Sequence, residues 1–279
     1  NQRGYSTDAA VLKELCAVHE LPALVLRYRE LAKIKSTYID ALPRMRAGDG
    51  RVHTCFNETA TTTGRLSSSD PNLQNIPVRT EFGRQIRESF VPLAPGERFL
   101  SADYSQIEMR LMAHLSGDEA LIEAFNSGED LHRTMASMVF GTPVAEVSAE
   151  ERSRIKATSY GLAYGLSSYG LAAQLGIPVP EAAALRERYF ERFGKVRDYL
   201  EGLVAQARAD GYTQTMFGRR RYLPDLTSDN RQRREMAERA ALNAPIQGSA
   251  ADIVQKAMID VDSALREQAL TSRILLQIH

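Results

Sequence analysis

RSRIKATSYGLAYG, residues 152–165, is the most informative stretch of this 279-residue chain. It contains no proline and predicts a helix of several turns. Arg152 and Lys156 are four residues apart. Tyr160 and Tyr164 continue this spacing, so the four side chains share one helical face about 18 Å long. Two cations followed by two aromatic rings suit a ligand with a polyanionic end and a flat end, such as a nucleoside triphosphate. A solvent-exposed stripe fits the spacing equally well, so the flanking segments decide between the two.

The composition is that of a globular protein, with 43% hydrophobic and 25% charged residues. No apolar run approaches the roughly 18 residues of a membrane span, so we expect no membrane association. Cys16 and Cys55 predict neither a disulfide framework nor a zinc site, which favours a reducing, cytoplasmic setting. The formal net charge is zero, but basic residues cluster at 27–35, 219–221 and 231–234. Such clusters fit two alternatives: a positive channel for a polyanion, or a solvated protein surface.

Helical patterns dominate the chain, and strand patterns are few. Helices are predicted at 6–20, 21–42, 105–115, 121–125, 131–140, 171–175, 180–193, 195–209, 232–243 and 251–265, with a kink at Pro245. Strands are predicted at 51–56, 99–103 and 273–279, and a hairpin at 212–224.

The segment 99–103 is expected to be a short buried strand that ends in Asp103. A carboxylate in that position, just before a helix, is a natural ligand for a divalent cation. The alternative is that Asp103 is only a turn residue. Ser105 and Glu108 have the spacing of a capping box for the following helix, which is the structural alternative for both.

A long polar run from Thr59 to Pro77 combines hydroxyls and amides with Arg65. Such side chains suit a sugar-phosphate backbone and the acceptors of the minor groove, although an ordered surface loop would contain the same residues. Arg239, Asn243 and Gln247 repeat the spacing of four on a largely apolar helix. Base edges or sugars would provide the partners that buried amides need.

Five stretches, in order, resemble motifs of the family A DNA polymerases, the bacterial DNA polymerase I type. The run 63–77 is similar to the primer-template segment, DYSQIE (103–108) to the first catalytic motif, and 152–165 to the nucleotide-binding helix. The run 239–248 resembles the minor-groove helix, and QIH (277–279) the beginning of the last motif. Together they span nearly the whole chain.

The resemblance implies an α+β, mostly helical fold: the right-hand polymerase, with an antiparallel palm sheet, helical fingers and a partial helical thumb. Residues 1–50 would be thumb, 51–116 and 239–279 palm, and 117–238 fingers. Both ends would be truncated, because the chain starts without methionine and stops at His279, where the family's last motif continues with Asp-Glu. Without the second metal-binding aspartate, we expect the 279 residues to polymerise poorly on their own.

The implied reaction is template-directed transfer of a nucleotidyl group from a dNTP to a primer 3′-hydroxyl, in DNA replication and repair. Two Mg²⁺ ions, or Mn²⁺, would hold the attacking and leaving oxygens. Asp103 would bind both ions and the backbone carbonyl of Tyr104 would bind one. Asp103, Arg152 and Lys156 would be catalytic, with Lys156 protonating the leaving pyrophosphate.

The family's binding residues carry over to matching positions here. Glu108 would exclude a 2′-hydroxyl. Tyr160 stands where many members have phenylalanine, which would weaken discrimination against dideoxynucleotides. The nucleotide would contact Ser105, Gln106, Ile107, Glu108, His132, Arg152, Lys156, Tyr160 and Tyr164. Primer and template would contact Lys33, Lys35, Ser36, Thr37, Arg65, Gln74, Asn75, Ser167, Ser168, Tyr169, Gly170, Arg239, Asn243, Gln247 and His279.

The expected protein is a monomeric, cytoplasmic, nucleoid-associated bacterial enzyme. Two other classes remain open. A non-catalytic module that binds primer-template DNA would use the same frame, and an Asp-Glu pair following His279 would argue against it. A helical nucleotide-binding regulator would use the face from Arg152 to Tyr164 alone, and a gel shift with primer-template DNA would distinguish it.

Overall fold

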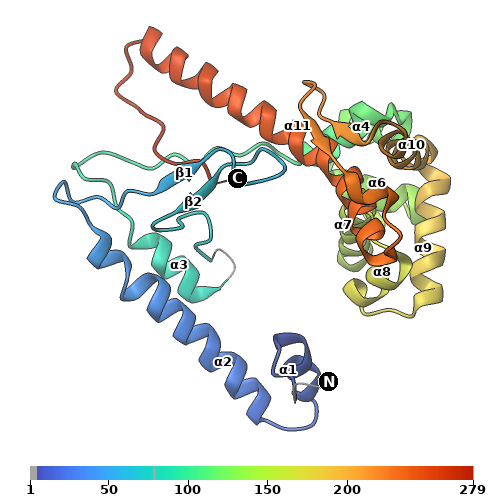
Figure 1. The fold of residues 1–279 in the computed structure, drawn as a ribbon, viewed down its shortest axis with the longest axis horizontal. Helices are drawn as coiled ribbons and strands as arrows, with labels where there is room; N and C mark the ends of the chain where they lie inside the picture. The colour runs from blue at the N-terminus through green and yellow to red at the C-terminus, as the bar shows by residue number, and fades with distance from the viewer. Residues whose placement is uncertain (1–4, 78–79, 279) are drawn as a thin grey trace. The chain divides into compact units, whose positions relative to one another are not determined.

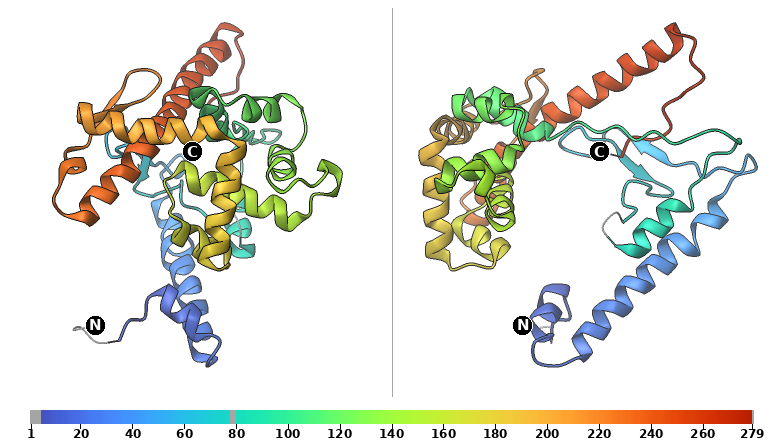
Figure 2. Two further views of the ribbon diagram at one scale, coloured as in Figure 1. Left: turned by 90° about the vertical axis from the view of Figure 1, so that its right-hand side faces the viewer. Right: turned by 180° about the vertical axis from the view of Figure 1, so that it is seen from behind.

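The computed structural model describes residues 5–77 and 80–278, and the chain forms two compact units (Figures 1 and 2). Unit 1 consists of the described residues of 1–60, 66–102 and 276–279, and unit 2 of 61–65 and 103–275. In the described part of the chain, no helix has both the length and the apolar character required to cross a bilayer.

Unit 1 is built on a long helix followed by a small sheet. Its elements are α1 (Ala9–Leu15), α2 (Leu21–Ile34), a π-helical turn η1 (Lys35–Ile39), a 3₁₀ turn η2 (Leu42–Met45), β1 (Cys55–Asn57), β2 (Ser67–Ser69) and α3 (Glu81–Glu88). Strands β1 and β2 pair antiparallel, with Cys55 opposite Ser69. Figure 1 shows α3 beside α2, where Ile34 and Ile86 share a core with Leu73. This core fixes the polar run, because Leu73 belongs to it.

Unit 2 is a helical bundle with one hairpin. It contains α4 (Ile107–Ser116), α5 (Glu119–Asn126), α6 (Leu131–Phe140), η3 (Val144–Glu146), α7 (Ala149–Ala163), α8 (Ser168–Leu175), α9 (Val179–Arg192), α10 (Gly194–Asp210), β3 (Tyr212–Gln214), β4 (Arg220–Tyr222), η4 (Pro224–Thr227) and α11 (Arg231–Glu267). Helix α6 packs on α7, α8 on α9, and α10 on both α4 and α11. Figure 2 shows the corner at which α9 passes into α10. The largest buried cluster includes Met109, Met135, Ile155 and Phe193.

Most helices of unit 2 begin at the residue type that their sequence predicts. Asp118, Asp130 and Ser167 each accept a backbone N–H in the first turn of the helix that follows. Ser148 and Glu151 form a reciprocal capping box at the start of α7. The described residues form mostly helices, with two small antiparallel sheets, so the mostly helical α+β class is confirmed.

The predicted strands at 99–103 and 273–279 are wrong for their described residues. Leu100 is 93% exposed, and both segments are irregular. A strand needs a neighbour for its backbone hydrogen bonds. In the described residues β1 pairs with β2 and β3 with β4, an isolated bridge joins Arg46 to Val52, and none of these pairings includes 99–103 or 273–278.

Helix α11 is one helix from Arg231 to Glu267, whereas the sequence predicts two helices divided at Pro245. Proline removes one backbone hydrogen bond from a helix. Its neighbours Ala244 and Ile246 are buried, and this packing holds the turn around Pro245 together. The capping box that was the structural alternative for Ser105 and Glu108 is not formed, because α4 begins after Gln106 without a side-chain cap. The assignment of thumb, palm and fingers to residue ranges stays a prediction.

Candidate functional site

Helix α7 separates a buried side from a polar stripe, as its spacing predicts. Ile155 is fully buried in the main core of unit 2. Along the other face, Lys156 is exposed, while Arg152 and Tyr160 are partly exposed. Tyr164 follows directly after the last helical residue and is half-buried. The four residues of the stripe therefore form a continuous accessible face with cations at the N-terminal end.

Arg152 is paired with a carboxylate that the sequence did not single out. Its Nε donates to Asp130 Oδ1 at 3.0 Å, and its Nη2 donates to Asp130 Oδ2 at 2.8 Å. Asp130 is also the N-cap of α6, where it accepts the backbone N–H of Arg133. The hydrogen bond from Arg152 is the main reason that the pKa of Asp130 falls to about 2. Asp130 is thus ionised at any physiological pH.

His132, predicted to contact the triphosphate, lies beneath the stripe. Its side chain is only 2% exposed, and its ring packs 5.9 Å from that of Tyr160. Burial, together with the charge of Lys156, lowers the pKa of His132 to about 4. Its Nδ1 has no hydrogen-bond partner in the described part of the chain. His132 is therefore neutral at pH 7.

Glu108 connects three segments of unit 2. It accepts a hydrogen bond from Arg65 Nη2 at 2.6 Å and another from the hydroxyl of Tyr164. The pKa of Tyr164 is raised, first by burial and then by its bond to Glu108, while Gln247 and the charge of Arg65 oppose the rise. The hydroxyl of Tyr164 thus remains a donor, and the ring is held at the C-terminal end of the stripe.

The segment 61–65, which carries Arg65, is fastened to α11 and to the hairpin. Arg219 donates to the carbonyl of Thr63 at 2.7 Å, to that of Gly248 at 3.1 Å, and to Asp252 Oδ1. Gln255 Nε2 donates to the carbonyl of Gly64 at 2.8 Å. In the sequence, Arg219 is one of three consecutive basic residues, and nothing in that local pattern predicts that it binds the carbonyls of Thr63 and Gly248.

The polar stripe predicted on α11 is present and lies close to the end of α7. Arg239 is exposed, and Asn243 and Gln247 are half-buried. Gly165 has φ +71°, and a Cβ there would lie 2.7 Å from the side chain of Leu242 and 3.4 Å from that of Arg239. A close approach of the two helices therefore requires glycine at this position.

Asp103, Tyr104 and Ser105 are exposed immediately before α4, and Gln106 and Ile107 are half-buried at its start. In the described ranges, no three His, Cys, Asp or Glu side chains gather as a metal-binding group. Asp103 is therefore accessible, as predicted, but it is a single carboxylate.

The predicted DNA contacts of unit 1 are mostly on its surface. Gln74 Nε2 donates to the carbonyl of Gln277 at 3.1 Å, and the carbonyl of Asn75 accepts from Tyr38. Exposed positions on α2 and η1 are Lys33, Lys35, Ser36 and Thr37. His279 lies outside the described residues.

The predicted template-bordering residues of unit 2 form the start of α8. Ser167 is its N-cap and accepts the N–H of Gly170. Ser168 is half-buried, and Tyr169 is highly exposed. An unburied tyrosine at a helix start offers an aromatic surface next to the end of α7.

The whole chain, residues 1–279, matches the family model of DNA polymerase family A. It is 60% identical over 278 residues to the DNA polymerase I of Mycobacterium tuberculosis and 50% identical over 277 residues to that of Geobacillus stearothermophilus. These alignments cover 99% of this chain but only 31% and 32% of the relatives, so the chain spans just under a third of their length.

A solved structure of a polymerase domain also matches this chain. The POL domain of Pol1 from M. smegmatis, in complex with DNA primer-template and dNTP, is 58% identical and superposes with a TM-score of 0.91. The match covers 100% of this chain and 49% of that one. The family match and the structural match both extend over the whole chain, so the protein belongs to DNA polymerase family A.

Proposed function

We propose that the protein is a DNA-directed DNA polymerase that extends a primer along a template, in DNA replication and repair. The observation that carries this proposal is the face of α7, where Arg152 and Lys156 precede Tyr160 and the Tyr164–Glu108 hydrogen bond. That face has the charge distribution and length of a nucleoside triphosphate. Further support comes from the M. smegmatis relative, whose structure contains DNA primer-template and dNTP.

In the proposed reaction, the primer 3′-hydroxyl loses its proton to water and its oxygen forms a bond to the α-phosphorus of the dNTP. The bond from that phosphorus to the bridging oxygen breaks, and pyrophosphate leaves. Arg152 and Lys156 hold the phosphates, and Lys156 donates a proton to the departing oxygen. Glu108 lies against the sugar and excludes a 2′-hydroxyl, while Tyr164 holds the position of the base pair. Ser105, Gln106, Ile107 and His132 complete the nucleotide-binding set.

The proposed metal is Mg²⁺, as two ions, with Mn²⁺ as a substitute. The carboxylate of Asp103 and the carbonyl of Tyr104 are oxygen donors of the kind that Mg²⁺ prefers, and both are accessible. Mg²⁺ would stabilise charge on the transferring phosphoryl group. One carboxylate would supply only part of a two-ion site.

The proposed DNA partner is a primer-template duplex. Arg65, Arg239, Asn243 and Gln247 would contact it from unit 2, together with Ser167, Ser168, Tyr169 and Gly170. Gln74, Asn75 and the basic surface of α2 and η1 would contact it from unit 1. We also propose that the enzyme acts as a monomer in the bacterial cytoplasm, associated with the nucleoid, and that thumb, palm and fingers follow the predicted ranges.

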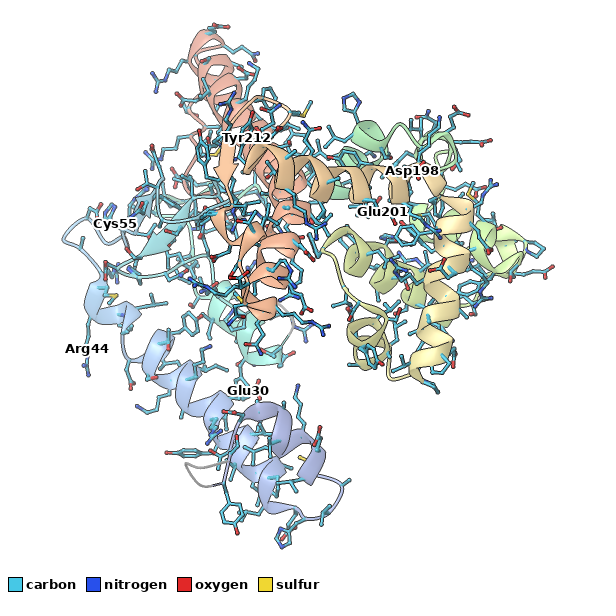
Figure 3. All side chains as sticks on the ribbon, turned by 45° about the vertical axis from the view of Figure 1, so that its right-hand side comes forward. Glu30, Arg44, Cys55, Asp198, Glu201 and Tyr212 are labelled. Atoms are coloured by element: carbon cyan, nitrogen blue, oxygen red, sulfur yellow. The ribbon has the colours of Figure 1, made fainter. Side chains whose placement is uncertain are left out.

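The test is primer extension by the protein with labelled primer-template, all four dNTPs and Mg²⁺. Asp103→Asn is expected to lower the rate of extension by at least about 100-fold, because a charged group near the transferring phosphoryl is lost. Binding of primer-template, measured by fluorescence anisotropy, should change little. The matched control is Asp198→Asn, an exposed aspartate on α10 that is labelled in Figure 3.

Extension that is equal in Asp103→Asn and in the parent would contradict the assigned role of Asp103. Binding of primer-template without any extension by the parent, in the presence of Mg²⁺ or Mn²⁺, would instead support the DNA-binding module without catalysis. Binding of dNTP but not of primer-template would favour the helical regulator.

A further inference from the structure

Asp130 holds three donors at the point where the start of α6 meets α7. Its Oδ1 accepts the backbone N–H of Arg133 at 2.9 Å and Nε–H of Arg152 at 3.0 Å, and its Oδ2 accepts Nη2–H of Arg152 at 2.8 Å. The two helices pack against each other, and they are neighbours in Figure 1. Both oxygens of the carboxylate are thus committed in fixed directions.

A helix cap alone does not require this arrangement. An N-cap needs a single side-chain acceptor, and Asn or Ser provides one as well as Asp does. The second oxygen and the negative charge of Asp130 act on Arg152 instead. The resulting pair is a two-point contact between planar groups, which fixes the direction of the guanidinium as well as its position.

The pair leaves Arg152 able to bind a further anion. A guanidinium has five N–H donors, and the contact with Asp130 uses one on Nε and one on Nη2. The two donors of Nη1 and the second donor of Nη2 remain. Lys156 is one turn further along the same face and is exposed. The remaining donors of Arg152 and the ammonium of Lys156 therefore belong to one cationic surface.

We propose that Asp130 is a positioning residue for the triphosphate of the incoming nucleotide and acts through Arg152. The inference rests on the polymerase function proposed above. An arginine side chain that is ordered before the nucleotide arrives loses less conformational entropy on binding. Asp130 is itself held by the first turn of α6, so the direction of Arg152 follows the position of that helix.

Simple competition between Asp130 and the triphosphate is the opposite possibility, and the geometry disfavours it. The carboxylate occupies the Nε edge of the guanidinium and leaves the Nη1 edge open. Its charge is also partly neutralised by the N–H groups of the helix terminus. Competition predicts that removing the charge improves nucleotide binding, whereas positioning predicts that it weakens it.

The experiment measures KM and kcat for dNTP in primer extension by the protein and by Asp130→Asn. Asparagine keeps an acceptor for the cap but loses the charge and the second acceptor for Arg152. KM is expected to rise by about threefold to tenfold, with a smaller change in kcat, because ordering one long side chain has an effect of that size. Inorganic tripolyphosphate, used as a competitive inhibitor, should lose affinity by the same factor, since only the phosphate contact is affected.

The comparison is repeated with Arg152→Ala. If Asp130 acts through Arg152, then adding Asp130→Asn to Arg152→Ala will not raise KM further. The matched control is Glu181→Gln. Glu181, on α9, pairs with Arg154 at 2.9 Å. Arg154 lies on α7 but off the stripe, so loss of the Glu181 charge should leave KM unchanged.

An unchanged or lower KM in Asp130→Asn would overturn the inference. An equal rise in KM with and without Arg152 would overturn it too, since that result means a structural role for the cap. Failure of the proposed function is a different result: the parent protein itself would then show no extension with dNTP and primer-template.

Discussion

The hydroxyl of Tyr164 donates a hydrogen bond to the carboxylate of Glu108, two residues 56 positions apart in the sequence. The bond connects the end of α7 to the first turn of α4. Glu108 is simultaneously bound by Arg65, so its charge is balanced in a site where its side chain is only 14% exposed. The last ring of the α7 stripe is therefore fixed by polar contacts as well as by packing.

Tyr164→Phe removes this donor and keeps the ring. We expect the free energy of unfolding to fall by about 1.5 kcal/mol, the usual contribution of a hydrogen bond to a charged group. Urea unfolding followed by circular dichroism measures the change. The control is Tyr199→Phe, because burial alone raises the pKa of Tyr199, to about 12, with no contribution from a hydrogen bond. A loss of the same size in both variants would contradict the assigned bond.

Tyr160→Phe tests the sugar end of the site. Burial and the charge of Glu108 raise the pKa of the Tyr160 hydroxyl, which therefore stays protonated and able to donate. Under the proposed function, this hydroxyl stands in for the missing 3′-hydroxyl of a dideoxynucleotide. The variant should prefer dNTP over ddNTP at least about tenfold more strongly than the parent, as expected for one lost hydrogen bond to a charged ligand. Competitive incorporation measures the ratio, and equal ratios would refute the assignment.

Gly64→Ala is expected to destabilise the protein by about 1–3 kcal/mol. Gly64 has φ +79°, and a Cβ there would lie 2.5 Å from the guanidinium of Arg219. That guanidinium cannot move freely, because it holds the carbonyls of Thr63 and Gly248. The free energy of unfolding is again measured in urea.

Gly176→Ala distinguishes the backbone strain at Gly64 from the clash between an added Cβ and Arg219. Gly176 has a similar φ of +68°, but an added Cβ would meet nothing within 4 Å. Its substitution reports the backbone strain alone. The loss at Gly64 should exceed that at Gly176, and the reverse order would show that Arg219 gives way without a penalty.

His132→Gln should weaken the dependence of stability on pH. The pKa of His132 falls from 6.5 to about 4 in the folded protein, chiefly through burial. Between these values the unfolded chain binds a proton that the folded protein does not, so stability falls as pH falls from about 6.5 to about 4. His132 should account for about 2 kcal/mol of the loss between pH 7 and pH 5. Parallel curves of unfolding free energy against pH for parent and variant would exclude this contribution.

The sequence predicts those parts of the site that depend on local spacing. The stripe of α7 follows from residues four apart, and α6 and most of α8 follow from the helical patterns at 131–140 and 171–175. The second role of Asp130 could not be predicted, because its partner Arg152 is 22 residues away and an aspartate before a helix needs no other explanation. Glu108 shows the same limit: its spacing from Ser105 indicates a cap, but its actual partners come from other elements.

Strand prediction fails for a different physical reason. Phe99 and Leu100 are apolar, but a strand exists only with a neighbouring backbone, and the described residues offer this segment none. Pro245 is the converse case. Its local effect is to weaken a helix, and burial in the surrounding bundle outweighs that effect.

The bond between Gln74 and the carbonyl of Gln277 has a consequence for biosynthesis. Its two residues are 203 positions apart, and Leu276 packs on the same core as Leu73. During translation at ~5–20 residues per second, roughly 10 to 40 s separate the appearance of these two segments. Unit 1 therefore begins to emerge from the ribosome first, yet it reaches its full set of contacts only after the whole of unit 2 has been made.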